Sequence, residues 1–260
     1  MTQVCEFLEW DSEFFGIRVA RVLGDWLDPQ RIAEIESWCC TARVDCLYFL
    51  SRCDQYQTAR LAEAHGFHWV DVRMTFEYDR RGTVTEADRD VPGPTIIIRS
   101  AKESDIPVLR GIARVSYAHS RFYYDERFSR ALCDEMYAVW IEKCCHGHAD
   151  VVLVAEMDGN PIGYVTCLLD RSNHTGTIDL VAVAAAAAGR GVGLRLLSAA
   201  KRWFLENGAM RVMVATQGRN IGAQRLYQRS GFITYGVQLW YHRWLNRENS
   251  GTGISSGPRE

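Results

Sequence analysis

Apolar residues follow two alternating periods along residues 95–242, and the change of period predicts a series of strands and helices. Short apolar runs bounded by turn residues predict strands, and apolar positions three and four apart predict helices. The expected strands are 95–101, 177–183, 210–216 and 232–242, and the expected helices are 103–117, 127–145, 192–207 and 220–230. Residues 150–170 give two apolar strands around Met-Asp-Gly-Asn, a sequence typical of a β-hairpin. Strands that alternate with helices indicate an α/β fold.

The N-terminal third repeats part of this pattern. Residues 47–78 resemble residues 213–244, with Gly66-Phe67 on Gly231-Phe232, and a helical stretch at 29–42 precedes the first copy as 192–207 precedes the second. The first copy has Ala62 where the second has Tyr227, and no glycine cluster lies upstream of it. We therefore expect a partial duplication in which the first copy is not catalytic.

Two polar stretches rich in glycine, proline or serine divide the chain. Residues 79–94 separate the periodic regions, and residues 247–260 have little apolar surface to bury. The predicted organisation is a partial N-terminal domain (1–78), a linker (79–94), a complete domain (95–246) and a disordered tail (247–260).

Composition narrows the class of protein. The 260 residues carry a net charge of -2 and lack a lysine- or arginine-rich run, which argues against nucleic acid as the main partner. No apolar run approaches the roughly 20 residues of a membrane helix, and the N-terminus does not resemble a signal peptide. Nine cysteines without a CxxC pair argue against a disulfide framework or a zinc site. We expect reduced thiols, no metal and a cytoplasmic location.

Three alternate glycines lie between an expected strand and an expected helix. The start of a helix leaves about four amides without intrahelical acceptors, and the helix dipole adds positive potential there. Gly189, Gly191 and Gly193 leave room for a phosphate at that end, and Arg190 adds a guanidinium. The alternative is a flexible turn without chemical function. A Walker A loop is excluded because no Gly-Lys-Ser/Thr follows, and the G-x-G-x-G spacing does not suit a Rossmann loop.

The stretch "VAVAAAAAGRGVG" (181–193) resembles the acyl-CoA loop of the GNAT acetyltransferase superfamily, Gln/Arg-x-x-Gly-x-Gly/Ala after a strand. Ala188 departs from the pattern, because the family has Gln or Arg there. "RNIGAQRLYQRSGF" (219–232) resembles a second motif of the family, Asn-x-x-Ala-x-x-x-Tyr-x-x-x-Gly-Phe. The resemblance covers roughly residues 95–244. It implies a splayed mixed sheet flanked by helices, and acetyl-CoA as co-substrate.

The resemblance also implies roles for particular residues. Tyr227 would protonate the departing thiolate, although a core aromatic on an amphipathic helix is the simpler interpretation. Asn220 would lie near the cofactor, or act only as a helix N-cap. The expected cofactor-binding residues are Val181, Val183, Gly189, Arg190, Gly191, Val192, Gly193, Leu194 and Asn220.

A general base does not follow from the pattern. Asp179, Glu156 and His119 are candidates, and Asp179 and Glu156 are more typical of solvated surface acids than of a general base.

The acceptor side resembles one branch of the superfamily. "FLEWDSEFFG" (7–16), "SRFYYDERF" (120–128) and residues 214–232 resemble the TDP-fucosamine acetyltransferases, which acetylate the 4-amino group of a dTDP-linked 4-amino-4,6-dideoxygalactose. Arg121 and Tyr123 would contact the substrate, unless this stretch only connects two helices. The expected partner is a nucleotide amino sugar, with a homodimer left open. The alternatives are a peptide or protein N-acetyltransferase and a non-catalytic acyl-CoA-binding module.

Overall fold

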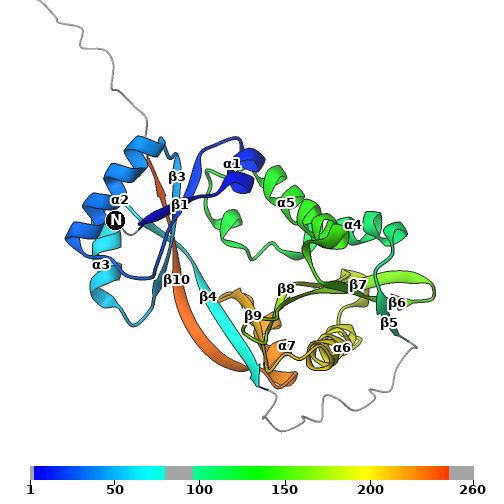
Figure 1. Cartoon of the computed structure of the whole chain (residues 1–260). Coiled ribbons are helices and arrows are strands. Elements are labelled where there is room, and N and C mark those ends of the chain that lie inside the picture. The colour runs from blue at the N-terminus through cyan, green and yellow to red at the C-terminus, as the bar shows by residue number, and fades with distance from the viewer. Residues whose placement is uncertain (1–2, 80–95, 246–260) are drawn as a thin grey trace, which may run out of the picture. The chain divides into compact units, whose positions relative to one another are not determined.

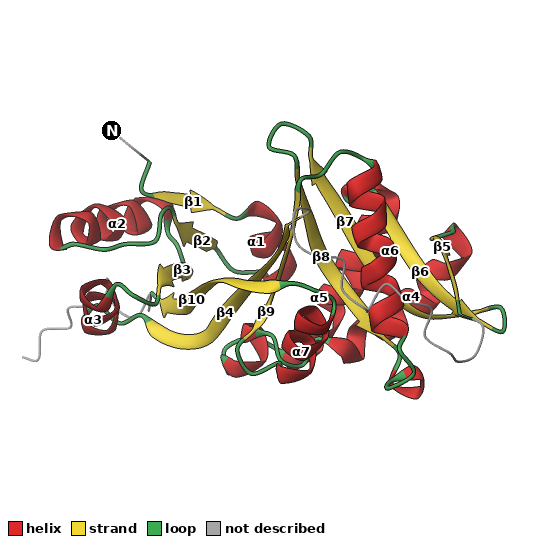
Figure 2. Ribbon diagram, turned by 90° about the horizontal axis from the view of Figure 1, so that it is seen from below, coloured by secondary structure: helices red, strands yellow, loops and turns green. Residues whose placement is uncertain are grey.

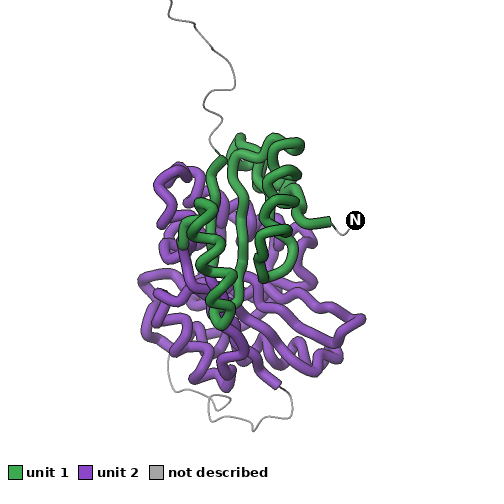
Figure 3. The backbone as a smooth tube through the Cα atoms, turned by 90° about the vertical axis from the view of Figure 1, so that its left-hand side faces the viewer, with its two compact units in different colours: residues 1–69, 240–260 green, residues 70–239 purple. Residues whose placement is uncertain are grey.

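A computed structural model of the chain describes residues 3–79 and 96–245 (Figure 1). The predicted tail, and the predicted linker apart from Asp79, lie outside the described residues. The chain divides into two compact units, unit 1 of residues 1–69 with 240–260 and unit 2 of residues 70–239 (Figure 3). The domain boundaries expected at residues 78, 95 and 246 remain predictions.

Unit 1 is a small sheet with helices. Its elements are β1 (Cys5–Phe7), α1 (Glu9–Phe15), β2 (Val19–Val22), α2 (Pro29–Ala42), β3 (Cys46–Arg52) and α3 (Tyr56–Ala64). β1 pairs antiparallel with β2, and β2 pairs parallel with β3. Helix α2 begins after Asp28, whose carboxylate accepts the Arg31 amide at 2.7 Å, and occupies the stretch in which the sequence predicts a helix.

Unit 2 contains a larger mixed sheet and carries the glycine loop. It begins within β4 (His68–Asp79) and ends within β10 (Ile233–Trp244), and the strands between them are β5 (Ile97–Ser100), β6 (Val151–Met157), β7 (Asn160–Asp170), β8 (Thr175–Val183) and β9 (Arg211–Gln217). Its helices are η2 (Glu103–Asp105), α4 (Ile106–Ser116), η3 (Arg121–Tyr124), α5 (Arg130–Lys143), η4 (Cys144–His148), η5 (Ala185–Ala187), α6 (Val192–Glu206) and α7 (Ile221–Arg229). The strand order is β4-β9-β8-β7-β6-β5. Only the β8–β9 pair among these is parallel.

The two copies of the repeat have exchanged their last strands. By the sequence alignment, β4 ends the first copy and β10 ends the second. β4 nevertheless pairs with β9 in unit 2, from Arg73↔Gln217 to Asp79↔Arg211. β10 lies next to β3 in the strand order, and its Tyr241 stacks on Phe49 within unit 1. Each unit is therefore completed by a strand of the other copy.

Helices cover both faces of the unit 2 sheet, with α4 and α5 on one face and α6 and α7 on the other (Figures 1 and 2). The α6 and α7 face holds a buried core to which α6 contributes Leu196, Leu197, Ala200 and Phe204. β4 contributes Phe76 and Tyr78 to the same core. The amphipathic period of residues 192–207 therefore marks the buried face of α6.

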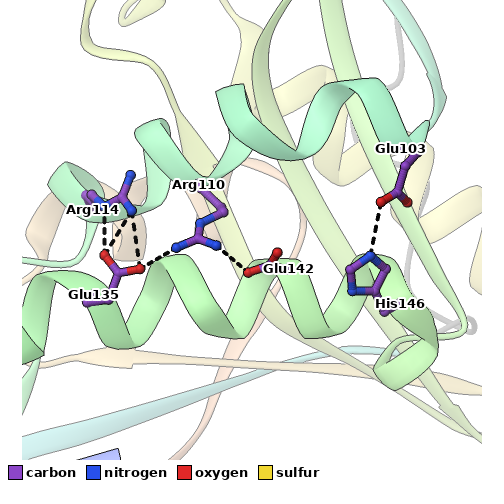
Figure 4. Close-up of polar contacts among 6 residues, drawn as sticks. All are labelled: Glu103, Arg110, Arg114, Glu135, Glu142 and His146. Atoms are coloured by element: carbon purple, nitrogen blue, oxygen red, sulfur yellow. Dashed lines mark hydrogen bonds and ion pairs between the residues drawn. The ribbon is translucent and has the colours of Figure 1, made fainter.

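On the other face, ion pairs join α4 to α5 (Figure 4). Arg110 binds both Glu135 and Glu142, and Arg114 binds Glu135 at 2.9 Å. A network that shares charges fixes two helices better than isolated exposed pairs do. It therefore holds the ends of α4 and α5, between which residues 117–129 run.

The predicted helices and strands of residues 96–244 are present, with shifts of a few residues at their ends. The hairpin between β6 and β7 turns at Asp158 and Gly159, with φ of 50° and 77°. Helix α1 was not predicted, because it buries none of its residues and so leaves no apolar period in the sequence. Among the described residues, no helix is long and apolar enough to cross a membrane, and no group of His, Cys, Asp or Glu could hold a metal ion.

Candidate active site

The glycine loop has the backbone that its sequence predicts. Gly189 and Gly191 adopt φ of 76° and 78°, a left-handed conformation that residues with a Cβ rarely take. Gly191 is the N-cap of α6, and its carbonyl accepts the Arg195 amide at 3.1 Å. Gly189 and Arg190 are exposed, so the loop lies at the surface. A Cβ on Gly189 would meet no atom within 4 Å, so the space beside it is open.

The first turn of α6 presents the amides of the remaining predicted cofactor residues. The first four amides of an α-helix have no intrahelical acceptor. In α6 these are the amides of Gly191, Val192, Gly193 and Leu194. Gly193 has a further reason to be glycine, because a Cβ there would lie 2.9 Å from Leu226 on α7. Gly193 therefore allows α6 and α7 to pack closely.

Beside this loop, β8 separates from β9. The two strands pair from Thr175↔Arg211 to Ile178↔Val214, and the last five residues of β8 are not paired with β9. On its other side β8 stays paired with β7, where the register shifts between Val165 and Cys167. The displaced Leu180 amide donates to Thr166 Oγ1 at 2.8 Å. The predicted splay is thus present, and Val181 and Val183 lie along it.

Tyr227 lies on α7, inside the core of unit 2. Its side chain is 3% exposed, and its ring lies 5.6 Å from that of Phe76 and 6.1 Å from that of Phe232. Burial raises the pKa of the phenol, which therefore keeps its proton at neutral pH. Both interpretations of the sequence fit this position, since Tyr227 is a core aromatic and also a protonated hydroxyl. Its catalytic role stays a prediction.

Asn220 caps α7, as the simpler interpretation of the sequence has it. Its side-chain oxygen accepts the Ala223 amide at 3.1 Å. A contact of Asn220 with a cofactor remains a prediction.

The three candidate bases lie in different surroundings. Glu156 is paired with Arg99 at 2.6 Å. His119 contributes to the charge around the buried Asp71. Asp179 follows the last β8–β9 pair; burial raises the pKa of its carboxyl, while the Trp140 indole donates a hydrogen bond to it. Of the three, Asp179 lies at the splay.

The predicted acceptor residues lie in η3, between α4 and α5. The hydroxyl of Tyr123 donates to Asp134, which ties the partly buried side chain to α5. The guanidinium of Arg121 lies 4.2 Å from the Phe122 ring centre and contributes to the charge around Arg73 and Asp71. Substrate contacts by Arg121 and Tyr123 stay predictions.

The sequence analysis did not predict a group of charged residues from the exchanged strand. Asp71 and Arg73 come from β4, and Arg219 follows β9. Arg219 Nη2 donates to the Val70 carbonyl at 2.8 Å and lies 3.5 Å from Asp71, and its guanidinium packs on the Tyr124 ring. Asp71 is 2% exposed, and burial raises its pKa to about 6. The alternation of "DVRMTF" (71–76) predicts that Asp71 and Arg73 lie on one face of a strand. It does not predict that this strand pairs with β9.

Comparisons with known proteins agree with this geometry. Residues 116–232 match the acetyltransferase (GNAT) family. The chain is 33% identical over 149 residues to "dTDP-fucosamine acetyltransferase" of Escherichia coli O6:H1, a match that covers 55% of this chain and 61% of that protein. It is 29% identical over 159 residues to "Spore coat polysaccharide biosynthesis protein SpsD" of Bacillus subtilis, covering 61% and 54%. The chain thus covers less than two thirds of either relative.

The fold also matches solved structures. A GCN5-related N-acetyltransferase from Sphaerobacter thermophilus superposes with a TM-score of 0.61 at 16% identity, over 92% of this chain and 76% of that one. At that identity the likeness concerns the fold alone. The glycine loop, the splay and the family match therefore lead to one conclusion: residues 116–232 form a GNAT acetyltransferase domain within a GNAT-type fold.

Proposed function

We propose that the protein is an acetyl-CoA-dependent N-acetyltransferase that acetylates an amino sugar. The observation that carries the proposal is the open start of α6 beside the splay of β8. The unpaired amides of the first turn suit the diphosphate of the coenzyme. The separated strand edge suits the pantetheine arm, which forms hydrogen bonds along a strand. The two features are adjacent in the chain, joined by residues 184–191.

The glycine loop fits a diphosphate on structural grounds. The space beside Gly189 is open, and a left-handed φ there turns the backbone around the start of the helix. Arg190 is exposed at the same turn and can pair with phosphate. Val181, Val183, Gly191, Val192, Gly193, Leu194 and Asn220 are proposed as further contacts.

Tyr227 is the proposed acid. Transfer forms a bond between the amine nitrogen and the acetyl carbon and breaks the bond from that carbon to sulfur. The departing thiolate needs a proton, and a phenol kept neutral by burial can supply it. Positioned acids contribute roughly 10²–10⁴-fold to such rates.

For the acceptor, we propose the 4-amino group of a dTDP-linked 4-amino-4,6-dideoxyhexose. The proposal is supported by the two relatives, one named as an acetyltransferase for dTDP-fucosamine and one as a protein of spore coat polysaccharide biosynthesis. Arg121 is proposed to contact the nucleotide sugar, and Tyr123 to line its site.

Release of free thiol from acetyl-CoA tests the function directly. The full chain is incubated with acetyl-CoA and, in separate reactions, a dTDP-linked 4-amino sugar, a peptide with a free N-terminus, and no acceptor. Turnover with the amino sugar is expected. Turnover with the peptide alone would favour a protein N-acetyltransferase, and binding of acetyl-CoA without turnover would favour a non-catalytic module.

A matched pair of glycine variants tests the loop. Gly189 and Gly208 flank the two ends of α6, both with positive φ and with no atom within 4 Å of an added Cβ. Gly189→Ala and Gly208→Ala should therefore cost similar folding stability, about 1 kcal/mol. Only Gly189→Ala is expected to weaken acetyl-CoA binding, measured by calorimetry. Equal affinities in both variants would remove the loop from the site.

A further inference from the structure

Two charged side chains, those of Arg73 and Asp179, lie on the α4 and α5 face of the unit 2 sheet, near the splay. Met74 and Phe76 of β4 pack with the α6 and α7 core, so the alternation of the strand turns Arg73 to the opposite face. Ile178 of β8 belongs to the same core, and the next residue, Asp179, is hydrogen-bonded by Trp140 of α5. Arg73 and Asp179 therefore share one face, and each contributes to the charge around the other.

Both side chains have a buried atom that the described protein leaves without a hydrogen-bond partner. These atoms are Arg73 Nε and Asp179 Oδ2. A buried polar atom without a partner costs about 1–3 kcal/mol, and more when the group is charged. Burial lowers the pKa of Arg73 and raises that of Asp179, so both charges are disfavoured where they lie. The arrangement is unfavourable for folding alone and suits a ligand that supplies both partners.

The surrounding charge indicates what the ligand carries. Arg121 of η3 faces Arg73 closely enough to lower the pKa of that guanidinium further. A second guanidinium whose charge reaches the first favours an anion at this place, and arginine binds phosphate and carboxylate through paired N–H groups. A carboxylate with a free oxygen accepts a hydrogen bond from an amine.

We propose that Arg73 and Asp179 form the acceptor subsite, in which Arg73 binds an anionic group of the acceptor and Asp179 receives its amino group. The proposal rests on the proposed acetyl transfer. It gives the first copy of the repeat a role in the reaction, since Arg73 belongs to the exchanged strand β4. The acceptor class is an amine that also bears a phosphate, diphosphate or carboxylate.

The reaction balances with these residues. The neutral amine attacks the thioester carbon, the N–C bond forms, and the C–S bond breaks. The nitrogen loses one proton to the Asp179 carboxylate, and the sulfur gains one from Tyr227. Return of the Asp179 proton to Tyr227 through water restores both groups, so the net products are the amide and free coenzyme A.

Binding of dTDP, measured by calorimetry without acetyl-CoA, tests the anion site. Arg73→Met is expected to weaken dTDP binding at least about tenfold, the loss typical of a hydrogen bond to a charged group. Arg229→Met, at an exposed position of α7, is the matched control and should bind dTDP as the wild type does. Acetyl-CoA affinity should be unchanged in both variants. Wild-type affinity for dTDP in Arg73→Met overturns the proposal.

Galactose 1-phosphate is titrated in parallel to identify the source of the anion. Binding as tight as that of dTDP assigns the site to a sugar phosphate, and much weaker binding assigns it to a nucleoside diphosphate. If the wild type binds neither, the anion site is refuted. If Arg73→Met does not fold, by circular dichroism, Arg73→Gln must show the same loss, and wild-type affinity in that variant is equally fatal to the proposal.

Asp179→Asn separates this subsite from the function as a whole. It should keep dTDP affinity within about twofold and lower kcat for the amino sugar roughly 10²-fold or more. Unchanged kcat would remove Asp179 from the subsite. Absence of thiol release by the wild type with any acceptor would refute acetyl transfer, whereas rapid transfer to uncharged amines, unaffected by Arg73→Met, would refute only the subsite.

Discussion

Helices α3 and α7 occupy equivalent places in the two copies and have nearly the same backbone ending. In the first copy Phe67 donates its amide to the Ala62 carbonyl at 2.9 Å, and in the second Phe232 donates to the Tyr227 carbonyl at 3.0 Å. The glycine before each phenylalanine has a positive φ, 74° in one case and 85° in the other. Both phenylalanines are 2% exposed. The copies thus share the architecture of the turn.

The difference lies in one side chain, because the position that holds the buried hydroxyl of Tyr227 holds the methyl group of Ala62. The turn therefore forms with either a tyrosine or an alanine at this position. In the comparison of β4 with β10, it is the first copy that carries the charged residues. β4 carries Asp71 and Arg73 where β10 carries Gly236 and Gln238, so the first copy supplies the charged strand to unit 2.

The largest effect is expected from truncating the shared phenylalanines. Phe67→Ala and Phe232→Ala each remove a fully buried ring, and each should lower the free energy of unfolding by about 3–5 kcal/mol. Denaturant unfolding measures both losses. Phe232→Ala alone should also lower kcat, because its ring contacts Tyr227. Equal effects of both variants on kcat would contradict the functional difference between the copies.

A large catalytic effect is expected from the one side chain that differs. Tyr227→Phe should lower kcat for thiol release by roughly 100-fold or more, with acetyl-CoA affinity unchanged. The variant keeps the ring contacts with Phe76 and Phe232, so its unfolding should change little. Unchanged turnover would assign Tyr227 to the core alone.

Asp71 of β4 should make the free energy of unfolding depend on pH, by about 2 kcal/mol between pH 4 and 8. The pKa of Asp71 is about 6 in the folded state, above its ordinary value of 3.8, so its contribution to stability is complete below pH 3.8 and is lost as pH rises through 6. Asp71→Asn cannot ionise and should lack this loss. Unfolding measured from pH 4 to 8 should show the wild type declining relative to the variant. Asp158→Asn, in an exposed turn, serves as control; parallel curves for Asp71→Asn and the wild type would argue against a raised pKa.

The smallest effect concerns the helix starts. Asn220→Ala should cost about 1 kcal/mol, because α7 loses the cap on the Ala223 amide. Gln55→Ala should cost almost nothing, since the N-cap of α3 makes no side-chain hydrogen bond. Asn220→Asp keeps the cap, so a loss of acetyl-CoA affinity in that variant would identify a separate cofactor contact.

Local signals in the sequence accounted for most of the fold. The Asp-Gly turn and the apolar period of residues 192–207 each act within a few residues, and both predicted elements are present. The repeat was also visible, because it depends on residue identities alone. What it could not show is which copy's last strand pairs with β9, since the alternation of residues 68–79 fits either neighbour.

The candidate site divides in the same way. The loop and α7 residues lie in compact motifs, so their places followed from the sequence once the motifs were recognised. Arg73 lies more than 100 residues from Asp179 in the sequence, and the two share one face of the sheet only because β4 pairs with β9. Burial and buried atoms without partners distinguish them, and no local pattern encodes either.

The exchange of β4 and β10 has a consequence for the history of the chain. An ancestor with two separable modules could lose either one. Here, deletion of the first copy would remove β4 from its place beside β9 and would expose a row of unpaired amides and carbonyls on β9. The pairing of β4 with β9 therefore ties the second copy to the first, whatever chemistry the first copy has.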